Sequence, residues 1–228
     1  MLNELTEATP KDSKPTSGRG MLIVVSSPSG GGKGTLIDRV LQTVAGISYS
    51  VSYTTRLPRA KEQNGREYFF VSTPAFKEMI KRGEFLEWAD VYGHLYGTSH
   101  SQVDRERDAG RDIILEIDVQ GAESIRGLVP DAVTVFILPP SFELLRKRLT
   151  ARGTDSAEDL QRRLRGAPAE VEQYRNFQYV ILNDDINRAS AQLGSVIYAE
   201  RARRERQETT LKDALADFVR AGSAQDHS

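Results

Sequence analysis

A glycine-rich loop that ends in a lysine is the first feature of this sequence that could do chemistry. The apolar stretch 21–25 leads into it, and the segment 36–41 after it is typical of a helix. Backbone N–H groups of such a loop converge on an anion, the helix dipole favours negative charge, and the lysine adds a full positive charge. We therefore predict a phosphate-binding site for a nucleotide in Ser27, Pro28, Ser29, Gly30, Gly31, Gly32, Lys33, Gly34 and Thr35.

The loop departs from the usual pattern G-x-x-x-x-G-K-[ST] at two positions. Ser27 stands where the pattern has glycine, and Gly34 stands where it has the hydroxyl residue that ligates magnesium. Thr35 is the nearest hydroxyl that could take over that contact. The alternative interpretation is a strand-to-helix turn that binds no ligand. We favour the phosphate loop, because the strand, three glycines, Lys33 and the helix stand in register.

A second candidate site lies in the basic segment 50–59. Arg56 and Arg59 are three residues apart, Pro58 restricts the chain between them, and hydroxyl side chains flank the pair. Two guanidinium groups held in this way can bind a phosphate through paired hydrogen bonds. Such a pair is also typical of a solvated basic loop, so the segment alone leaves both interpretations open.

The elements that must position these residues follow from the apolar pattern. Strands are expected over 21–26, 47–52, 68–71, 85–91, 113–117, 133–138 and 180–182. Helices are expected over 34–45, 73–82, 99–110, 119–128, 141–151, 156–175 and from 186 onward. Strands that alternate with helices predict an α/β fold, with a mostly parallel sheet and helices on both of its faces.

The alternation breaks between residues 52 and 100, which predicts an inserted lobe. Ligands of such sheets bind at the carboxyl ends of the strands, where the loop, Ser52, Asp118 and Asn183 all fall. We expect a flexible tail over 1–20 and a charged tail over 207–228. The domain between them, 21–206, divides into a core (21–51, 101–140 and 166–206), the lobe (52–100) and a helical lid (141–165).

Composition excludes several classes of function. The 228 residues include no cysteine, which rules out disulfides, thiolate metal sites and a cysteine nucleophile. A formal charge of −1 gives no reason to expect nucleic acid or a membrane surface as a partner. We expect the basic stretch 201–206 to be a solvated helix face or a dimer contact, so a homo-oligomer stays open. No segment resembles a membrane span or a signal peptide, which predicts a cytoplasmic protein.

Six further motifs follow the phosphate loop in an order that resembles the guanylate kinases, a family of nucleoside-monophosphate kinases. They are S-Y-T-T-R-L-P-R at 52–59, F-L-E-W-A at 85–89, Y-G-T at 96–98, I-D-V-Q-G at 117–121, R-G-T at 152–154 and N-D-D at 183–185. The similarity runs from about 21 to 201, and motifs in order are far more specific than any one alone. The resemblance implies transfer of the γ-phosphoryl group of ATP to GMP or dGMP, with Mg²⁺.

The same resemblance implies which residues hold each nucleotide. The phosphate loop and Asn183 would bind ATP. For GMP, the implied set is Arg56, Arg59 and Tyr68 on the phosphate, and Ser52, Glu87, Thr98 and Tyr96 around the guanine. Guanine presents its N1–H and 2-amino donors side by side, and one carboxylate can accept both. Adenine lacks this donor pair, so AMP would leave Glu87 unpaired at a cost of at least ~1–3 kcal/mol.

The acids 116 and 118 are the candidates for the metal and for the GMP side of the site. An acid at a strand end opposite a phosphate loop can hold magnesium or its waters. The family has Asp where this chain has Glu116, so we expect Asp118 to be the main one, with Thr35 beside the metal. A helix N-cap is the alternative role of Asp118, and the two roles are compatible.

Charge neutralisation is the chemistry expected of the remaining residues. Phosphoryl transfer has little covalent chemistry, so positioning and positive charge carry the rate and no general base is required. Arg148 and Arg152 lie four residues apart on one helical face, and Arg163 comes from the next helix. They match the arginines of the family's lid. The implied catalytic set is Lys33, Arg56, Arg148, Arg152, Arg163 and Asp118.

Two other functions stay open at this point. A non-catalytic guanylate-kinase-like module would keep the fold and bind peptides in the lobe cleft. Lys33 and its glycines argue against it, although Gly34 leaves an opening. A kinase of another monophosphate or of a phosphorylated sugar is the second alternative, and Glu87 with its neighbouring hydroxyls argues for guanine instead.

The assignment of Glu87 generates a first prediction. Glu87→Gln should raise the KM for GMP sharply, because an amide cannot accept both guanine donors, whereas ATP affinity should stay at the wild-type value. Steady-state kinetics with varied GMP, together with a direct ATP titration, measure the two effects. Unchanged GMP kinetics in this variant would contradict the assignment.

Overall fold

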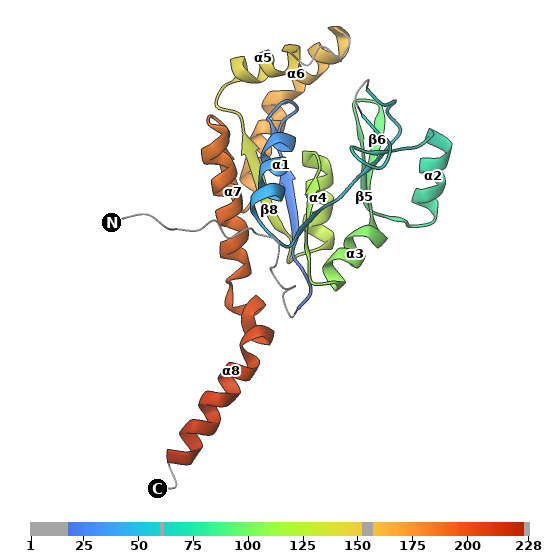
Figure 1. Cartoon of the computed structure of the whole chain (residues 1–228). Helices are drawn as coiled ribbons and strands as arrows, with labels where there is room; N and C mark the ends of the chain where they lie inside the picture. The colour runs from blue at the N-terminus through green and yellow to red at the C-terminus, as the bar shows by residue number, and fades with distance from the viewer. Residues whose placement is uncertain (1–17, 60–61, 152–156, 226–228) are drawn as a thin grey trace.

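We describe the protein from a computed structural model, which places residues 18–59, 62–151 and 157–225 (Figure 1). Its described strands form two sheets. The larger has the order β2-β7-β1-β8-β9 and the smaller the order β4-β3-β6-β5. Figure 1 shows the smaller sheet beside the larger one, on the side away from α7.

The larger sheet is parallel throughout, as the sequence predicts. Its strands are β1 (Leu22–Ser26), β2 (Ile47–Tyr49), β7 (Asp112–Glu116), β8 (Val133–Leu138) and β9 (Tyr179–Leu182). The strand expected over 47–52 ends at Tyr49, and the others agree with expectation within about a residue.

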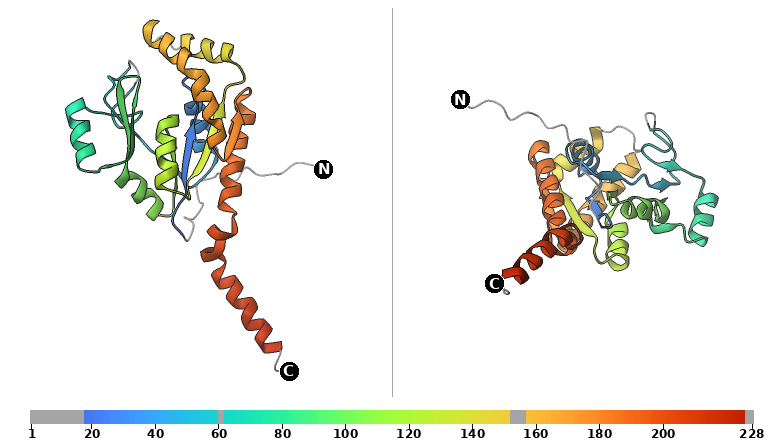
Figure 2. Two further views of the ribbon diagram at one scale, coloured as in Figure 1. Left: turned by 180° about the vertical axis from the view of Figure 1, so that it is seen from behind. Right: turned by 60° about the horizontal axis from the view of Figure 1, so that its bottom comes forward.

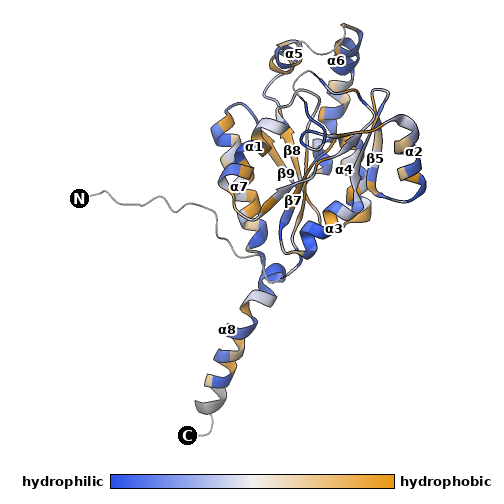
Figure 3. Cartoon of the chain, turned by 45° about the vertical axis from the view of Figure 1, so that its right-hand side comes forward, coloured by the Kyte–Doolittle hydropathy of each residue, from blue (hydrophilic) through white to orange (hydrophobic). Residues whose placement is uncertain are grey.

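Helices cover both faces of this sheet. On one face lie α1 (Lys33–Thr43) and α7 (Ile186–Arg201), and on the other α3 (His100–Asp108) and α4 (Val119–Leu128). Successive residues of β1 point to opposite faces, so Ile23 packs with α1 and α7, and Leu22 packs with α3 and α4. A strand buried on both faces is apolar along most of its length, which explains the run 22–25. Figure 3 shows the same hydrophobic colouring in this sheet near the labels β8 and β9.

The smaller sheet contains two strands that the sequence analysis did not predict. Its members are β3 (Tyr53–Thr54), β4 (Phe69–Phe70), β5 (Phe85–Val91) and β6 (His94–Ser99), with α2 (Thr73–Lys81) packed beside it. The two strands that were not predicted are β3, which is very short, and β6, in which Gly97 weakens the sequence pattern of a strand. A Cβ on Gly97 would lie 2.8 Å from the Phe85 ring, so packing of the buried aromatic side chains requires glycine there.

The remaining helices lie above and below the larger sheet. At the end of the molecule where the phosphate loop lies are α5 (Phe142–Ala151) and α6 (Ala157–Glu172), followed by the 3₁₀ turn η1 (Gln173–Asn176). The helix α8 (Arg204–Gln225) projects away from the body of the molecule (Figure 2). Since α6 continues unbroken past residue 165, the predicted lid boundary falls inside a helix.

A buried ion pair fastens the last core helix to the sheet. Asp112 accepts a 2.7 Å hydrogen bond from the Met21 N–H and pairs at 2.7 Å with Arg201 at the end of α7. Removing one partner of a buried pair leaves the other charge uncompensated, which is strongly destabilising.

We therefore predict that Asp112→Asn lowers the free energy of unfolding by about 3 kcal/mol, because Arg201 loses its counter-charge. Urea unfolding measures the change. Asp108→Asn is the matched control, because its exposed pair with Arg19 should contribute less than ~1 kcal/mol. Equal stability of the two variants would contradict the prediction.

Candidate active site

A cavity at the carboxyl ends of β1 and β7 brings the two predicted phosphate sites together. The predicted residues that line it are Ser27, Ser29, Gly30, Gly31, Gly32, Lys33, Ser52, Arg56, Arg59, Tyr68, Glu87, Tyr96, Glu116, Asp118 and Arg163. Pro28, Gly34, Thr35, Thr98, Arg148 and Asn183 lie outside the lining, and Arg152 lies outside the described residues. The position of the cavity agrees with the rule for ligands on parallel sheets.

Backbone conformation explains the glycines of the phosphate loop. Gly30 and Gly32 have φ angles of 84° and 93°, a left-handed conformation that glycine adopts without strain. The intervening Gly31 has no room for a side chain, since a Cβ would lie 2.6 Å from the Ser27 hydroxyl oxygen. Ser27 also accepts a 3.2 Å hydrogen bond from Lys33 Nζ. The serine that departs from the usual pattern therefore contacts the lysine that the pattern requires.

Asn183, predicted to bind ATP, and Arg148, a predicted lid arginine, both contact the backbone of the phosphate loop. The Asn183 side-chain amide donates a 2.8 Å hydrogen bond to the carbonyl of Gly31, and Arg148 donates to the same carbonyl at 3.2 Å. Arg148 also donates to the backbone carbonyl of Asn183 at 3.2 Å. In this arrangement both side chains hold the loop in shape.

Gly34, which departs from the usual phosphate-loop pattern, lies next to Glu116, which departs from the family. A Cβ on Gly34 would be 3.5 Å from Oε2 of Glu116, so this carboxylate stands beside the position where the pattern has a hydroxyl. The Tyr49 hydroxyl donates to the same oxygen at 3.2 Å. Thr35, by contrast, is exposed on α1.

Asp118 caps helix α4, as its alternative interpretation proposed. Its Oδ1 accepts a 2.8 Å hydrogen bond from the Gly121 N–H. Burial raises the pKa of Asp118 above its ordinary value, although the cap and the charge of Lys33 act in the opposite direction. The carboxylate lines the cavity, so capping and ligand contact are compatible.

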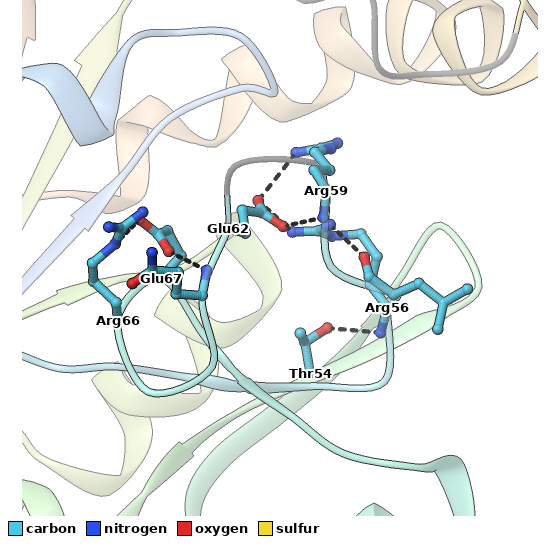
Figure 4. A network of polar contacts seen from close by, with 8 residues as sticks. Thr54, Arg56, Arg59, Glu62, Arg66 and Glu67 are labelled. Atoms are coloured by element: carbon cyan, nitrogen blue, oxygen red, sulfur yellow. Dashed lines mark hydrogen bonds and ion pairs between the residues drawn. The ribbon is translucent and has the colours of Figure 1, made fainter.

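The arginine pair is organised by an acid that the sequence analysis missed, as Figure 4 shows. Glu62 accepts 2.8 Å hydrogen bonds from the Arg56 guanidinium and from the Arg59 N–H. Burial alone would raise the pKa of Glu62, but these hydrogen bonds outweigh it and lower the pKa. Arg56 is 9% exposed and lies over the Tyr68 ring, so it is not part of a solvated basic loop. The one sign of this role in the sequence is the position of Glu62, three residues after Arg59.

Glu87, the acid predicted to recognise guanine, is buried. Glu87 lies opposite Thr98 in the β5–β6 ladder and accepts a 2.6 Å hydrogen bond from the Thr98 hydroxyl. Burial, with a contribution from the charge of Asp118, raises the pKa of Glu87 to about 7 despite that hydrogen bond. Gly121 is a further missed residue here, since its Cβ would lie 2.7 Å from Glu87 Oε2.

The comparisons with known proteins agree with this geometry. A family model described as guanylate kinase matches residues 19–200. The chain belongs to the guanylate kinase family. Among curated guanylate kinases, that of Dechloromonas aromatica is 53% identical over 180 residues, which are 79% of this chain and 89% of the relative. That of Symbiobacterium thermophilum is 47% identical over 203 residues, covering 89% of this chain and 96% of the relative.

A solved guanylate kinase has the same fold. The crystal structure of the guanylate kinase from Anaplasma phagocytophilum matches with a TM-score of 0.71 and 33% identity, covering 83% of this chain and 90% of the other. Among the described residues, each helix is too short or too polar to span a membrane.

The raised pKa of Glu87 predicts that GMP affinity increases with pH. The predicted guanine contact requires the ionised carboxylate, so below pH about 7 the free protein must first lose a proton. Each unit of pH below this value should weaken binding by up to ~10-fold. Calorimetric titration of GMP between about pH 5.5 and 8.5 measures the profile.

Glu87→Gln supplies the control, because the phosphate of GMP itself titrates near pH ~6 and affects both proteins equally. The step near pH 7 should be absent from the variant. Identical profiles for the variant and the wild type would show that Glu87 does not control the affinity.

Proposed function

We infer that this chain catalyses the reversible transfer of the γ-phosphoryl group of ATP to GMP, giving ADP and GDP. The observation that carries the inference is one cavity lined both by a phosphate loop with its lysine and by Arg56 and Glu87 of the smaller sheet. The activity agrees with membership of the guanylate kinase family and with the near full-length match to its curated members.

We assign the ATP phosphates to the phosphate loop, Ser27 to Thr35, with Lys33 near the transferred group. The left-handed Gly30 and Gly32 support this assignment, because such a backbone lets successive N–H groups face one anion. Asn183 stays a proposed contact for adenine, and its hydrogen bond to the loop places it at the same end of the sheet.

We assign GMP to the other half of the cavity. Arg56, Arg59 and Tyr68 would hold its phosphate, and Ser52, Glu87, Thr98 and Tyr96 would surround its guanine. Support comes from the burial of Arg56, Glu87 and Thr98, because buried charges and hydroxyls recognise a partner far more strongly than exposed ones. Glu62 would share the arginines with the phosphate.

Charge stabilisation carries the proposed catalysis. Lys33, Arg56 and Arg163 line the cavity between the two assigned nucleotides, where negative charge spreads over the transferring oxygens. Arg148 contributes through the loop that it supports, and Arg152 remains a predicted lid residue. Closing of the proposed lid, 141–165, over the lobe, 52–100, would exclude water from the reaction.

Magnesium is the proposed metal partner, and it would neutralise and bridge the phosphate oxygens. The described residues contain no group of three acidic or histidine side chains able to hold a metal by themselves. The donor set therefore suits Mg²⁺ held mainly by phosphate oxygens and water, as this ion prefers. Asp118 and Glu116 supply carboxylates at the cavity wall, and Thr35 would have to act from an exposed position on α1.

Association and location complete the proposal. We propose that copies of the chain associate through α8, whose apolar side chains Leu211, Leu215 and Phe218 are exposed and spaced along one side of the helix. A role in purine nucleotide metabolism would follow from the reaction, and the cytoplasmic location expected from the sequence is part of the same proposal.

The test is a coupled ADP-release assay with ATP and Mg²⁺, in which GMP, AMP, CMP and UMP are offered in parallel. Turnover is expected with GMP and to a far smaller extent with AMP, which lacks the donors that Glu87 requires. Binding of GMP without turnover would instead indicate the non-catalytic module. Equal use of AMP and GMP would overturn the assignment of Glu87.

A further inference from the structure

Three parts of the cavity wall that are distant in sequence meet at one carboxylate. Oε2 of Glu170 on α6 accepts a 2.9 Å hydrogen bond from the Ser29 N–H in the phosphate loop. Oε1 of the same side chain accepts a 2.6 Å hydrogen bond from the Tyr92 hydroxyl, at the tip of the β5–β6 hairpin. All three residues line the cavity, and neither Tyr92 nor Glu170 has a role in the function assigned above.

We call the contacts of Glu170 with Ser29 and Tyr92 the junction, and other residues on the same face of α6 also contribute to it. Arg163, Gly166 and Glu170 follow one another at spacings of three and four residues, so they share a side of the helix. Arg163 donates a 2.8 Å hydrogen bond to the Ser29 hydroxyl, and its guanidinium lies 5.5 Å from the centre of the Tyr92 ring. Gly166 lets the tyrosine approach, since a Cβ there would lie 2.9 Å from its hydroxyl.

The backbone of Tyr92 indicates that its position matters. Its φ angle is 55°, and it is the one non-glycine residue with positive φ among those the structure describes. A two-residue turn with positive φ at both positions normally contains Asn, Asp or Gly, because other residues are strained there. Gly93 fits this rule with a φ of 85°, whereas Tyr92 breaks it. A local rule broken in a well-packed hairpin is typical of a functional position.

We propose that Tyr92 and Glu170 are positioning residues that couple the two nucleotide sites, an inference that rests on the function proposed above. Glu170 fixes the distance between the hairpin that carries Glu87 and the loop that would hold ATP. In-line transfer requires both phosphates within a narrow geometry, and a misplacement of ~1 Å can cost ~100-fold in rate. Nucleotide bound on one side then favours the arrangement of the other, and the coupling is reciprocal.

The experiment measures the dissociation constant of GMP with and without the non-hydrolysable imido analogue of ATP. In the wild type the analogue should tighten GMP binding. Tyr92→Phe removes only the hydroxyl, so this tightening should fall by about 10-fold, the loss expected for one hydrogen bond to a charged group. Affinity for the analogue alone should not change, and kcat should fall by a similar factor.

Two further variants separate positioning from simple stabilisation. Gly166→Ala pushes Tyr92 away without deleting a hydrogen-bonding group, and alanine favours the helix, so the coupling should be lost while the melting temperature stays equal or rises. In Tyr92→Phe/Glu170→Gln the loss should equal that of Glu170→Gln alone, because both changes break one junction. Tyr174→Phe and Glu172→Gln are the matched controls on the neighbouring turn and helix end, and they should behave as wild type.

Each outcome bears on a different claim. Unchanged coupling in Tyr92→Phe and Gly166→Ala, or independent additive losses in the double variant, would overturn the positioning role even if the wild type phosphorylates GMP. Absence of GMP phosphorylation by the wild type would instead overturn the proposed function. The positioning role is supported if the variants bind GMP alone and the analogue alone as the wild type does, but the analogue no longer tightens GMP binding.

Discussion

The conformation of the phosphate loop is the constraint on which the rest of the structure depends. Its carbonyl at Gly31 accepts hydrogen bonds from the side chains of Asn183 and Arg148, which belong to the far edge of the sheet and to α5. A carbonyl that faced the ligand would repel a phosphate, so the hydrogen bonds that hold this carbonyl on Asn183 and Arg148 favour anion binding by the loop. Because β1, β8 and β9 are neighbours and run parallel, the loop and Asn183 lie at the same carboxyl end of the sheet, and α5 follows β8 there.

Carboxylates already occupy donors that suit a phosphate. Glu62 holds the Arg56 guanidinium and the Arg59 N–H, and Glu170 holds the Ser29 N–H. A buried donor without a partner costs ~1–3 kcal/mol, so these acids stabilise the cationic site. Glu62 also opposes an incoming phosphate, which has to compete for the same arginine donors with its greater charge. Glu62 therefore holds the arginines in position and also competes with a phosphate for them.

The sequence predicts the larger sheet well because burial on both faces leaves an unambiguous pattern. β1 and β8 are apolar except at Ser26 and Thr134, and glycines and a lysine mark the turn that follows β1. The smaller sheet was harder to predict, because β6 is fixed by pairing with β5 across the Tyr92–Gly93 turn rather than by its own alternation. The arginine pair and Glu87 were assigned through the resemblance to the guanylate kinases, because neither short motif alone indicates a ligand.

The junction at Glu170 has no comparable local pattern. Tyr92 and Glu170 are separated by 78 residues, and only the packing of α6 against the hairpin brings them together. Hydrogen bonds of this kind depend on tertiary structure, so a single sequence offers no spacing from which to infer them. The sequence contained one hint, the bulky residue before Gly93 at a turn position that favours small polar residues.

Gly34 and Glu116, which depart from the phosphate-loop pattern and from the family respectively, show most directly what the fold adds to the sequence. In the sequence alone, Gly34 removes a hydroxyl and Glu116 lengthens an acid, two changes with no visible connection. In the fold they are neighbours, with 3.5 Å between the position of a Cβ at Gly34 and Oε2 of Glu116. That separation is an ordinary van der Waals contact, so the fold brings the Glu116 carboxylate against the start of α1. An oxygen donor therefore stands beside the start of α1 in either case, so the missing hydroxyl is no argument against a working phosphate loop.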